Sequence, residues 1–133
     1  MTVQAALAAF YARCHVDRRP TRALWLKVGP LAVPVPHPGR IDEHDLHHVV
    51  LDVDNDLAGE AVVSAFELRT GPPTFGIALL CLSGIAVGLL VAARRTVAAW
   101  RRGAGCRNCY SVDLDVARGW SVDELRSWCG LRR

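Results

Sequence analysis

Stretches rich in alanine and other apolar residues recur along the chain, and turn-forming glycine, proline and aspartate residues separate them. The alanine-rich stretch 3–13 predicts a short helix. Two more helices are expected over 43–51 and 57–69, because Asp42 and Asp56 stand where a carboxylate can cap the first turn. An aspartate-rich turn separates them. These two helices are expected to form an antiparallel pair.

Residues 24–35 alternate apolar residues with glycine and proline, which predicts an extended segment, partly β or polyproline in character. The pattern as a whole indicates an all-α fold in a single domain over residues 1–133, apart from this extended lead-in. The expected parts are an N-terminal helix with a basic loop (1–23), the lead-in (24–40), a helical hairpin (41–71), one long apolar helix (74–102), and a linker with a C-terminal helix (103–133).

Residues 74–93 carry no charge, and arginines follow them. The run is long enough to cross a bilayer. Gly84, Gly88 and Ala92 recur every four residues, so they form a stripe that lets another helix approach closely. We expect the helix to continue through Trp100, buried or in contact with a membrane, with a single membrane span as the alternative.

The C-terminal helix has clear signals at both ends. Ser121 and Glu124 have the spacing of a capping box, and Gly130 is expected to end the helix.

Composition narrows the classes of function. Apolar residues make up 51% of the chain and its mean hydropathy is +0.18, so part of it is expected to contact something apolar beyond its own core. A net charge of +3 is too small to indicate nucleic-acid binding. The five scattered cysteines fit a reducing compartment. No basic start precedes the first apolar stretch, so we expect no cleaved secretion signal and a cytoplasmic location.

The strongest chemical signal is His44-Asp45-Leu-His-His48, followed after eleven residues by Glu60. Two histidines four apart lie on the same side of a helix, and a carboxylate from the next helix can complete a metal site. Imidazole and carboxylate together suit zinc or another first-row divalent ion. Asp45 could reach the metal, act as a base, or orient a ligand.

The helical hairpin sets a geometric condition for this site. His44 begins one helix and Glu60 begins the next, so they lie at opposite ends of a tight hairpin unless the pair crosses steeply. The alternative is a polar helix start with histidines exposed by chance. His47 points elsewhere and is interpreted as a surface or packing residue. Cys106 and Cys109 are interpreted as an incidental pair in the linker.

The motif resembles the signature of the coenzyme Q (ubiquinone) biosynthesis Coq-four family, in its short bacterial form. Residue types and spacing agree at all four motif positions. The flanking segments are also similar, and they comprise the proline-rich lead-in (34–38), the second helix (59–61 and 65–68), the stretch 101–103 and the tail (112–131).

This resemblance implies a mostly helical protein that acts at the membrane face, peripheral on its inner side, on prenylated aromatic precursors. It implies a metal, usually zinc, at His44, Asp45, His48 and Glu60. The implied role is oxidative decarboxylation, a lyase-type replacement of a ring carboxyl by hydroxyl, or organisation of other biosynthetic enzymes. Asp45 or His47 could then move a proton, and the apolar helix could line a groove for the isoprenoid tail.

Three other functions remain open from the sequence. The first is a non-catalytic scaffold that binds prenyl lipid and partner enzymes. The second is a zinc hydrolase with Asp45 as the base. The third is a small integral membrane protein whose motif is accidental. A homodimer is compatible with each of them.

Overall fold

The computed structural model describes residues 1–14, 23–36 and 40–131 and confirms a helical fold with one β-hairpin. The expected basic loop falls mostly on residues 15–22, outside the described part. The elements are α1 (Val3–Cys14), β1 (Ala23–Val28), β2 (Leu31–Pro36), α2 (Ile41–Leu51), α3 (Leu57–Thr70), α4 (Phe75–Val91), α5 (Ala93–Arg102), the 3-10 turn η1 (Cys109–Ser111), α6 (Leu114–Gly119) and α7 (Val122–Cys129).

The extended lead-in is an antiparallel hairpin in which β1 pairs with β2 around a tight turn. Gly29 adopts a left-handed conformation in this turn, with φ of 58°, which glycine reaches without steric cost.

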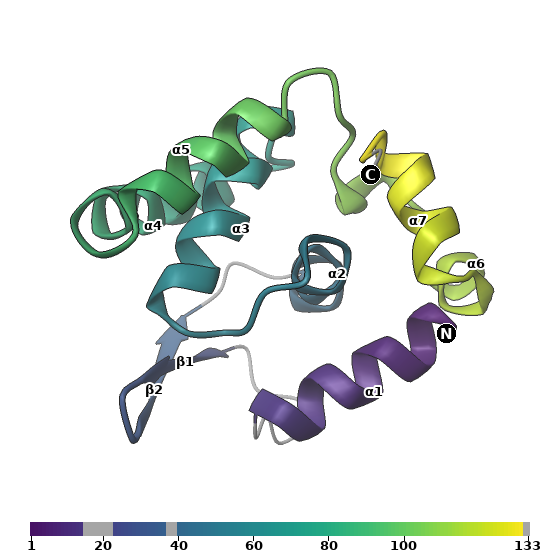
Figure 1. The fold of residues 1–133 in the computed structure, drawn as a ribbon, viewed down its shortest axis with the longest axis horizontal. Coiled ribbons are helices and arrows are strands. Elements are labelled where there is room, and N and C mark those ends of the chain that lie inside the picture. Colours follow the sequence, from purple (N-terminus) through teal and green to yellow (C-terminus); the bar gives the residue numbers. More distant parts are fainter. Residues whose placement is uncertain (15–22, 37–39, 132–133) are drawn as a thin grey trace.

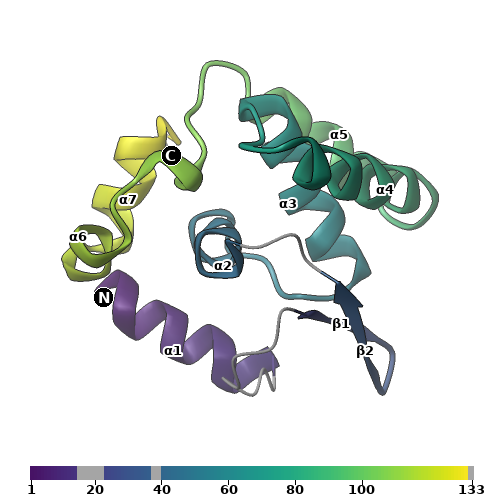
Figure 2. The same ribbon diagram turned by 180° about the vertical axis from the view of Figure 1, so that it is seen from behind.

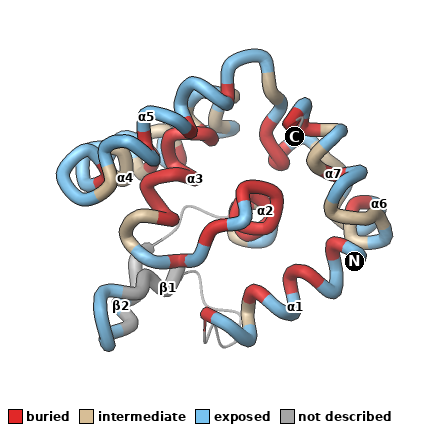
Figure 3. The backbone as a smooth tube through the Cα atoms, viewed as in Figure 1, coloured by how far each residue is buried: buried red, intermediate tan, exposed pale blue. Residues whose placement is uncertain are grey.

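Helix α2 occupies the centre of the molecule (Figures 1 and 2), with α1, α3 and the α6–α7 region around it. It is seen end-on in both views while α3 runs across them, so the two helices cross steeply. The expected antiparallel pair is therefore wrong, and the steep crossing is what the metal motif required. Residues 44–51 are all buried (Figure 3), so every polar side chain among them needs a partner inside the protein.

Most helix ends follow the local signals. The Asp56 side chain accepts a hydrogen bond from the Gly59 backbone N–H, and Gly71 ends α3. The capping box of Ser121 and Glu124 is complete. Asp42 is the exception, because α2 begins at Ile41 and no side chain caps it. Asp42 lies in the first turn instead, where its charge still favours the helix dipole.

The long apolar helix over 74–102 is wrong, since the chain breaks at Ala92 and α5 packs back beside α4 on α3. Glycine makes this packing possible. A side chain at Gly84 would clash with Ser64 of α3, and one at Gly88 would clash with Ala61 of α3 and with Thr96 of α5. The stripe of small residues therefore serves close helix packing inside the protein.

Helix α4 packs on α3 and α5, and its buried residues are Ile77, Cys81 and Gly88. Among the described residues, no helix combines the length and apolar character that a membrane span needs. The linker after α5 also holds two elements that the sequence pattern did not predict, η1 and α6.

Candidate metal centre

The crossing of α2 and α3 brings three metal-binding side chains together. His44 Nε2 lies 3.3 Å from Glu60 Oε2, and His48 Nε2 lies 3.3 Å from Glu60 Oε1. The two Nε2 atoms are themselves 3.3 Å apart. One donor atom from each residue can be chosen so that all lie within 4.8 Å of one another. His44, His48 and Glu60 therefore form a buried cluster that could hold a metal ion.

The other ring nitrogens of both histidines are already occupied. His44 Nδ1 lies 2.9 Å from Glu67 Oε1, and His48 Nδ1 lies 3.3 Å from the carbonyl oxygen of Val53. Each Nδ1–H can donate to its oxygen, so in the neutral rings the lone pairs are on the Nε2 atoms that face each other. Two facing lone pairs in a buried site favour a cation between them, or a proton in its absence.

The spacing of the donor atoms also fits a bound metal ion. A four-coordinate divalent ion with bonds of about 2.0–2.1 Å holds its donors about 3.3–3.4 Å apart. Glu60 Oε1 is buried and makes no hydrogen bond within the described part of the chain, although His48 Nε2 is close to it. A carboxylate oxygen without a donor in the interior is costly unless a charge compensates it. The residues present therefore fit a divalent metal, with a coordination position left for another ligand.

Glu67 is the hub of the polar network behind the cluster. Its Oε1 lies 2.9 Å from Nδ1 of both His44 and His47, and it accepts a 2.9 Å hydrogen bond from the Tyr110 hydroxyl. The Cys81 thiol donates to Oε2 over 3.4 Å. A carboxylate that holds the far nitrogen of a metal-binding histidine fixes the direction of that ring.

Charge is strongly coupled across this network. Burial alone would raise the pKa of Glu60, but His48 and His44 beside it lower that pKa to about 2. Burial would lower the pKa of His44, yet Glu67 and Glu60 together hold it well above its usual value. Without a metal, the two carboxylates therefore favour the protonated form of His44, and a metal ion must compete with that proton.

We expect the affinity for zinc to rise with pH through the neutral range. Because the pKa of His44 is raised in the metal-free protein, zinc competes with a bound proton until the pH exceeds that pKa. The expected slope is about tenfold in affinity per pH unit for one displaced proton. Competition with a chromophoric chelator at several pH values measures it, and a flat profile would contradict the assignment of His44 as a ligand.

Asp45 lies beside this cluster rather than in it. Its Oδ2 accepts a 2.8 Å hydrogen bond from the Tyr11 hydroxyl of α1, and the side chain is buried. Burial raises the pKa of Asp45, and the nearby His44, His48 and Tyr11 only partly offset this. Direct metal ligation by Asp45, and its role as a base, stay predictions.

His47 is a buried packing residue and not a surface one. Its Nε2 accepts a 2.8 Å hydrogen bond from the Cys109 backbone N–H, so its remaining ring proton belongs to Nδ1, which faces Glu67. The ring packs beside Phe66 and Tyr110. This arrangement ties η1 to α2, and the proposed role of His47 in moving a proton stays a prediction.

Sequence reasoning missed Glu67, Tyr11 and Tyr110 as parts of the site. Glu67 had a usable signal, because it follows Glu60 by seven residues, which places both on one face of α3. The two tyrosines come from α1 and η1, far along the chain, and gave no local signal. In the linker, Cys109 lies 3.7 Å from Cys129 while the Cys106 thiol donates to the Arg102 carbonyl, so the two linker cysteines have separate partners.

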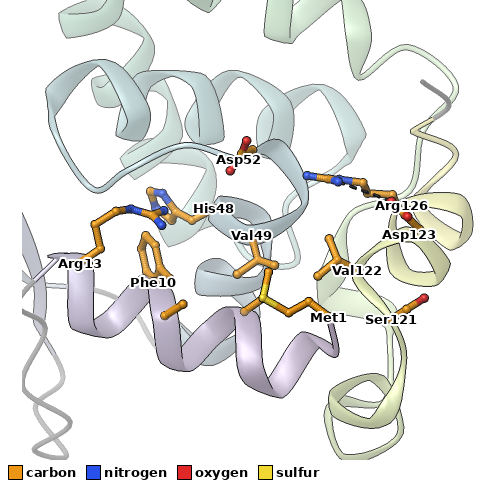
Figure 4. A pocket seen from close by; sticks show the side chains of 12 residues that line it. Met1, Phe10, Arg13, His48, Val49, Asp52, Ser121, Val122, Asp123 and Arg126 are labelled. Atoms are coloured by element: carbon orange, nitrogen blue, oxygen red, sulfur yellow. Dashed lines mark ion pairs between the residues drawn. The ribbon is translucent and has the colours of Figure 1, made fainter.

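A pocket of about 340 Å³ lies between α1, α2 and α7, and His48 is one of the residues that line it (Figure 4). Phe10 stacks on His48 there, with ring centroids 5.0 Å apart. Arg13 stands at one side of the pocket and pairs with Asp54, while Arg126 stands at the other and donates to the Val50 carbonyl. Helix α4 does not line this pocket.

Fold and site together define a small helical protein with a buried His–His–Glu cluster. Compared with known proteins, the chain matches no family model, no curated protein and no solved structure.

Proposed function

We propose that this protein binds zinc through His44, His48 and Glu60 and takes part in quinone-type biosynthesis. The proposed reaction is oxidative decarboxylation of a prenylated aromatic acid at a membrane surface. The convergence of two imidazole nitrogens and one carboxylate within 3.3 Å carries this proposal. Two histidines and one glutamate with a remaining coordination position are typical of catalytic zinc sites. The motif's resemblance to the Coq-four signature supports the pathway.

The residues in and around the cluster would have separate roles in such a reaction. A divalent ion held by His44, His48 and Glu60 would supply a Lewis acid for a substrate carboxylate or phenolate. Glu67 keeps His44 aimed at the ion through Nδ1, and the Val53 carbonyl does the same for His48. Asp45, whose pKa is raised by burial, is suited to hold or release a proton beside the site.

Conversion of a prenylated hydroxybenzoate tests the proposal directly. The protein loaded with a divalent first-row ion is expected to release carbon dioxide and form the hydroxylated ring. Dioxygen would supply the new hydroxyl oxygen, and ascorbate would supply the two electrons that reduce its second oxygen atom to water. Because zinc has no redox chemistry of its own, iron(II) is loaded in parallel with zinc. In Glu60→Gln we expect conversion to fall by more than about a hundredfold, because the carboxylate ligand is lost. Asp42→Asn is the matched control, because Asp42 is an exposed carboxylate on α2 outside the cluster, and it should keep full activity. Equal conversion in Glu60→Gln would contradict the assignment.

The burial of the cluster favours one alternative, a scaffold in which the metal holds the structure and lipid binds elsewhere. His44, His48 and Glu60 are exposed by only 3%, 1% and 8%. A metal-loaded protein that binds the prenylated acid without converting it would support the scaffold and overturn the proposed lyase activity.

A further inference from the structure

The outer side of α4 and α5 exposes large apolar side chains and arginines, and neither helix contains an aspartate or glutamate. We name the α4–α5 face by its residues, which are Phe75, Leu79, Leu82, Leu89 and Leu90 of α4 and Arg94, Arg95, Arg101 and Arg102 of α5. Both helices pack on α3 and lie along one edge of the molecule (Figures 1 and 2), where their outward sides are exposed (Figure 3).

The apolar part of this face is a continuous stripe. At 100° per residue, its five side chains fall within an arc of about 100° on α4, opposite Ile77, Cys81 and Gly88, which face the protein. Phe75 and Leu90, at the two ends, are 79% and 87% exposed. Exposed leucine and phenylalanine in one contiguous stripe mark a contact surface, because single surface apolar residues need no explanation but a stripe does.

The charged part of the face is purely positive. Between Leu68 and Val112 the chain has no aspartate or glutamate, yet it has six arginines. All six are exposed, and they are Arg69, Arg94, Arg95, Arg101, Arg102 and Arg107. Within the described residues, the four arginines of α5 make no ion pair with any carboxylate, whereas Arg13, Arg40, Arg118 and Arg126 elsewhere do.

We propose that the α4–α5 face binds the surface of an anionic lipid bilayer, with α4 lying in the plane of the interface. The leucine stripe would enter the boundary of the acyl chains while the α5 arginines pair with lipid phosphates. Trp100, 42% exposed beside the Arg69 guanidinium, is a residue type that favours this interface. The inference locates the membrane contact of the proposed function but does not depend on the metal or the reaction.

Charge argues against a second copy of the chain as the occupant. A symmetric dimer brings the same surface of both copies together, so unpaired arginines would face arginines with no acid nearby. Phosphate headgroups supply the missing negative charge. A nucleic acid would also supply it, but the exposed leucines would then contact a polar phosphate backbone without burying apolar area.

Sedimentation with lipid vesicles tests the proposal on the full chain. Wild type is expected to bind phosphatidylcholine vesicles that contain phosphatidylglycerol, to bind pure phosphatidylcholine weakly, and to be released partly by salt. Leu82→Glu and the double variant R94Q/R101Q should each lose about tenfold or more in binding to the anionic vesicles.

Matched changes on other faces serve as controls. Val116→Glu changes an exposed apolar residue of α6. The double variant R13Q/R118Q removes two positive charges, as R94Q/R101Q does, but from α1 and α6. Both should bind within about twofold of wild type, because all three residues lie on α1 or α6, outside the α4–α5 face. Circular dichroism checks that every variant keeps its helices. Chelation of metal should leave vesicle binding unchanged, which separates this inference from the proposed reaction.

Two outcomes would overturn the inference. One is equal binding of wild type to neutral and anionic vesicles, or binding to neither. The other is a concentration-dependent dimer that Leu82→Glu dissociates while vesicle binding stays absent, which would make the α4–α5 face an interface between copies of the chain.

Discussion

His48→Ala is expected to lower the affinity for zinc by more than about a hundredfold. Loss of a residue that only hydrogen-bonds to a metal ligand already lowers metal affinity by about ten- to a hundredfold, and His48 would itself be a ligand. His48 supplies one of the three converging donors, and its ring is held on two sides. The Val53 carbonyl fixes Nδ1 and Phe10 stacks on the ring face. No other described side chain joins the donor cluster with His44 and Glu60. Competition titration against a chromophoric chelator measures the loss.

Two further variants make this result interpretable. His48→Gln keeps much of the side-chain volume under Phe10 and should also lose zinc, which separates ligation from packing. Asp42→Asn on the same helix should bind zinc like wild type, because the exposed carboxylate of Asp42 lies outside the cluster. The same zinc stoichiometry and affinity in His48→Ala and wild type would remove the metal centre altogether.

Glu67→Ala is expected to destabilise the metal-free protein by about 3–5 kcal/mol, the range for removing one partner of a buried charge pair. The loss would leave the Tyr110 hydroxyl, the Cys81 thiol and the His44 ring without their common acceptor. It would also open a cavity in the core, because Glu67 is only 1% exposed. Urea unfolding at neutral pH with chelator present measures the change in free energy.

Glu67→Gln provides the matched comparison. The amide oxygen can still accept from Tyr110, so the cost should be clearly smaller, but the negative charge that raises the pKa of His44 is gone. His44 would then lose its proton at lower pH, and the pH dependence of zinc binding should shift in the same direction. If Glu67→Ala unfolded at the same urea concentration as wild type, the hub role of Glu67 would be refuted.

Local sequence signals predicted the helix ends well where a side chain and a backbone amide are close in sequence. Asp56 bonds the N–H of Gly59, and Ser121 and Glu124 bond each other's backbone. Asp42 failed because the chain enters α2 from a left-handed Arg40, whose guanidinium bonds Glu43 and the Tyr110 carbonyl. The start of α2 is thus linked by Arg40 to a residue 70 positions away, which no local pattern indicates.

The prediction of one long helix over residues 74–102 was wrong for a similar reason, since contacts between helices are not visible in the sequence. The composition of residues 74–102 predicts one continuous helix, and no residue next to Ala92 requires a break. After the break, Thr96 packs against Gly88, where a side chain would clash, and α5 returns along α3. In this arrangement the leucines of α4 that face away from α3 are exposed, so α4 is not a fully buried helix.

For the metal centre, the sequence by itself determined the ligand types and the placement of His44 and His48 on one side of a helix, since both follow from helical periodicity. Only the tertiary structure decided that Glu60 meets them, because that depends on the angle between α2 and α3. The same crossing selected Glu67 as the group that orients His44 and left Asp45 beside the cluster. Periodicity fixes positions within one helix, whereas the relation between helices is set by side chains that pack across the whole core.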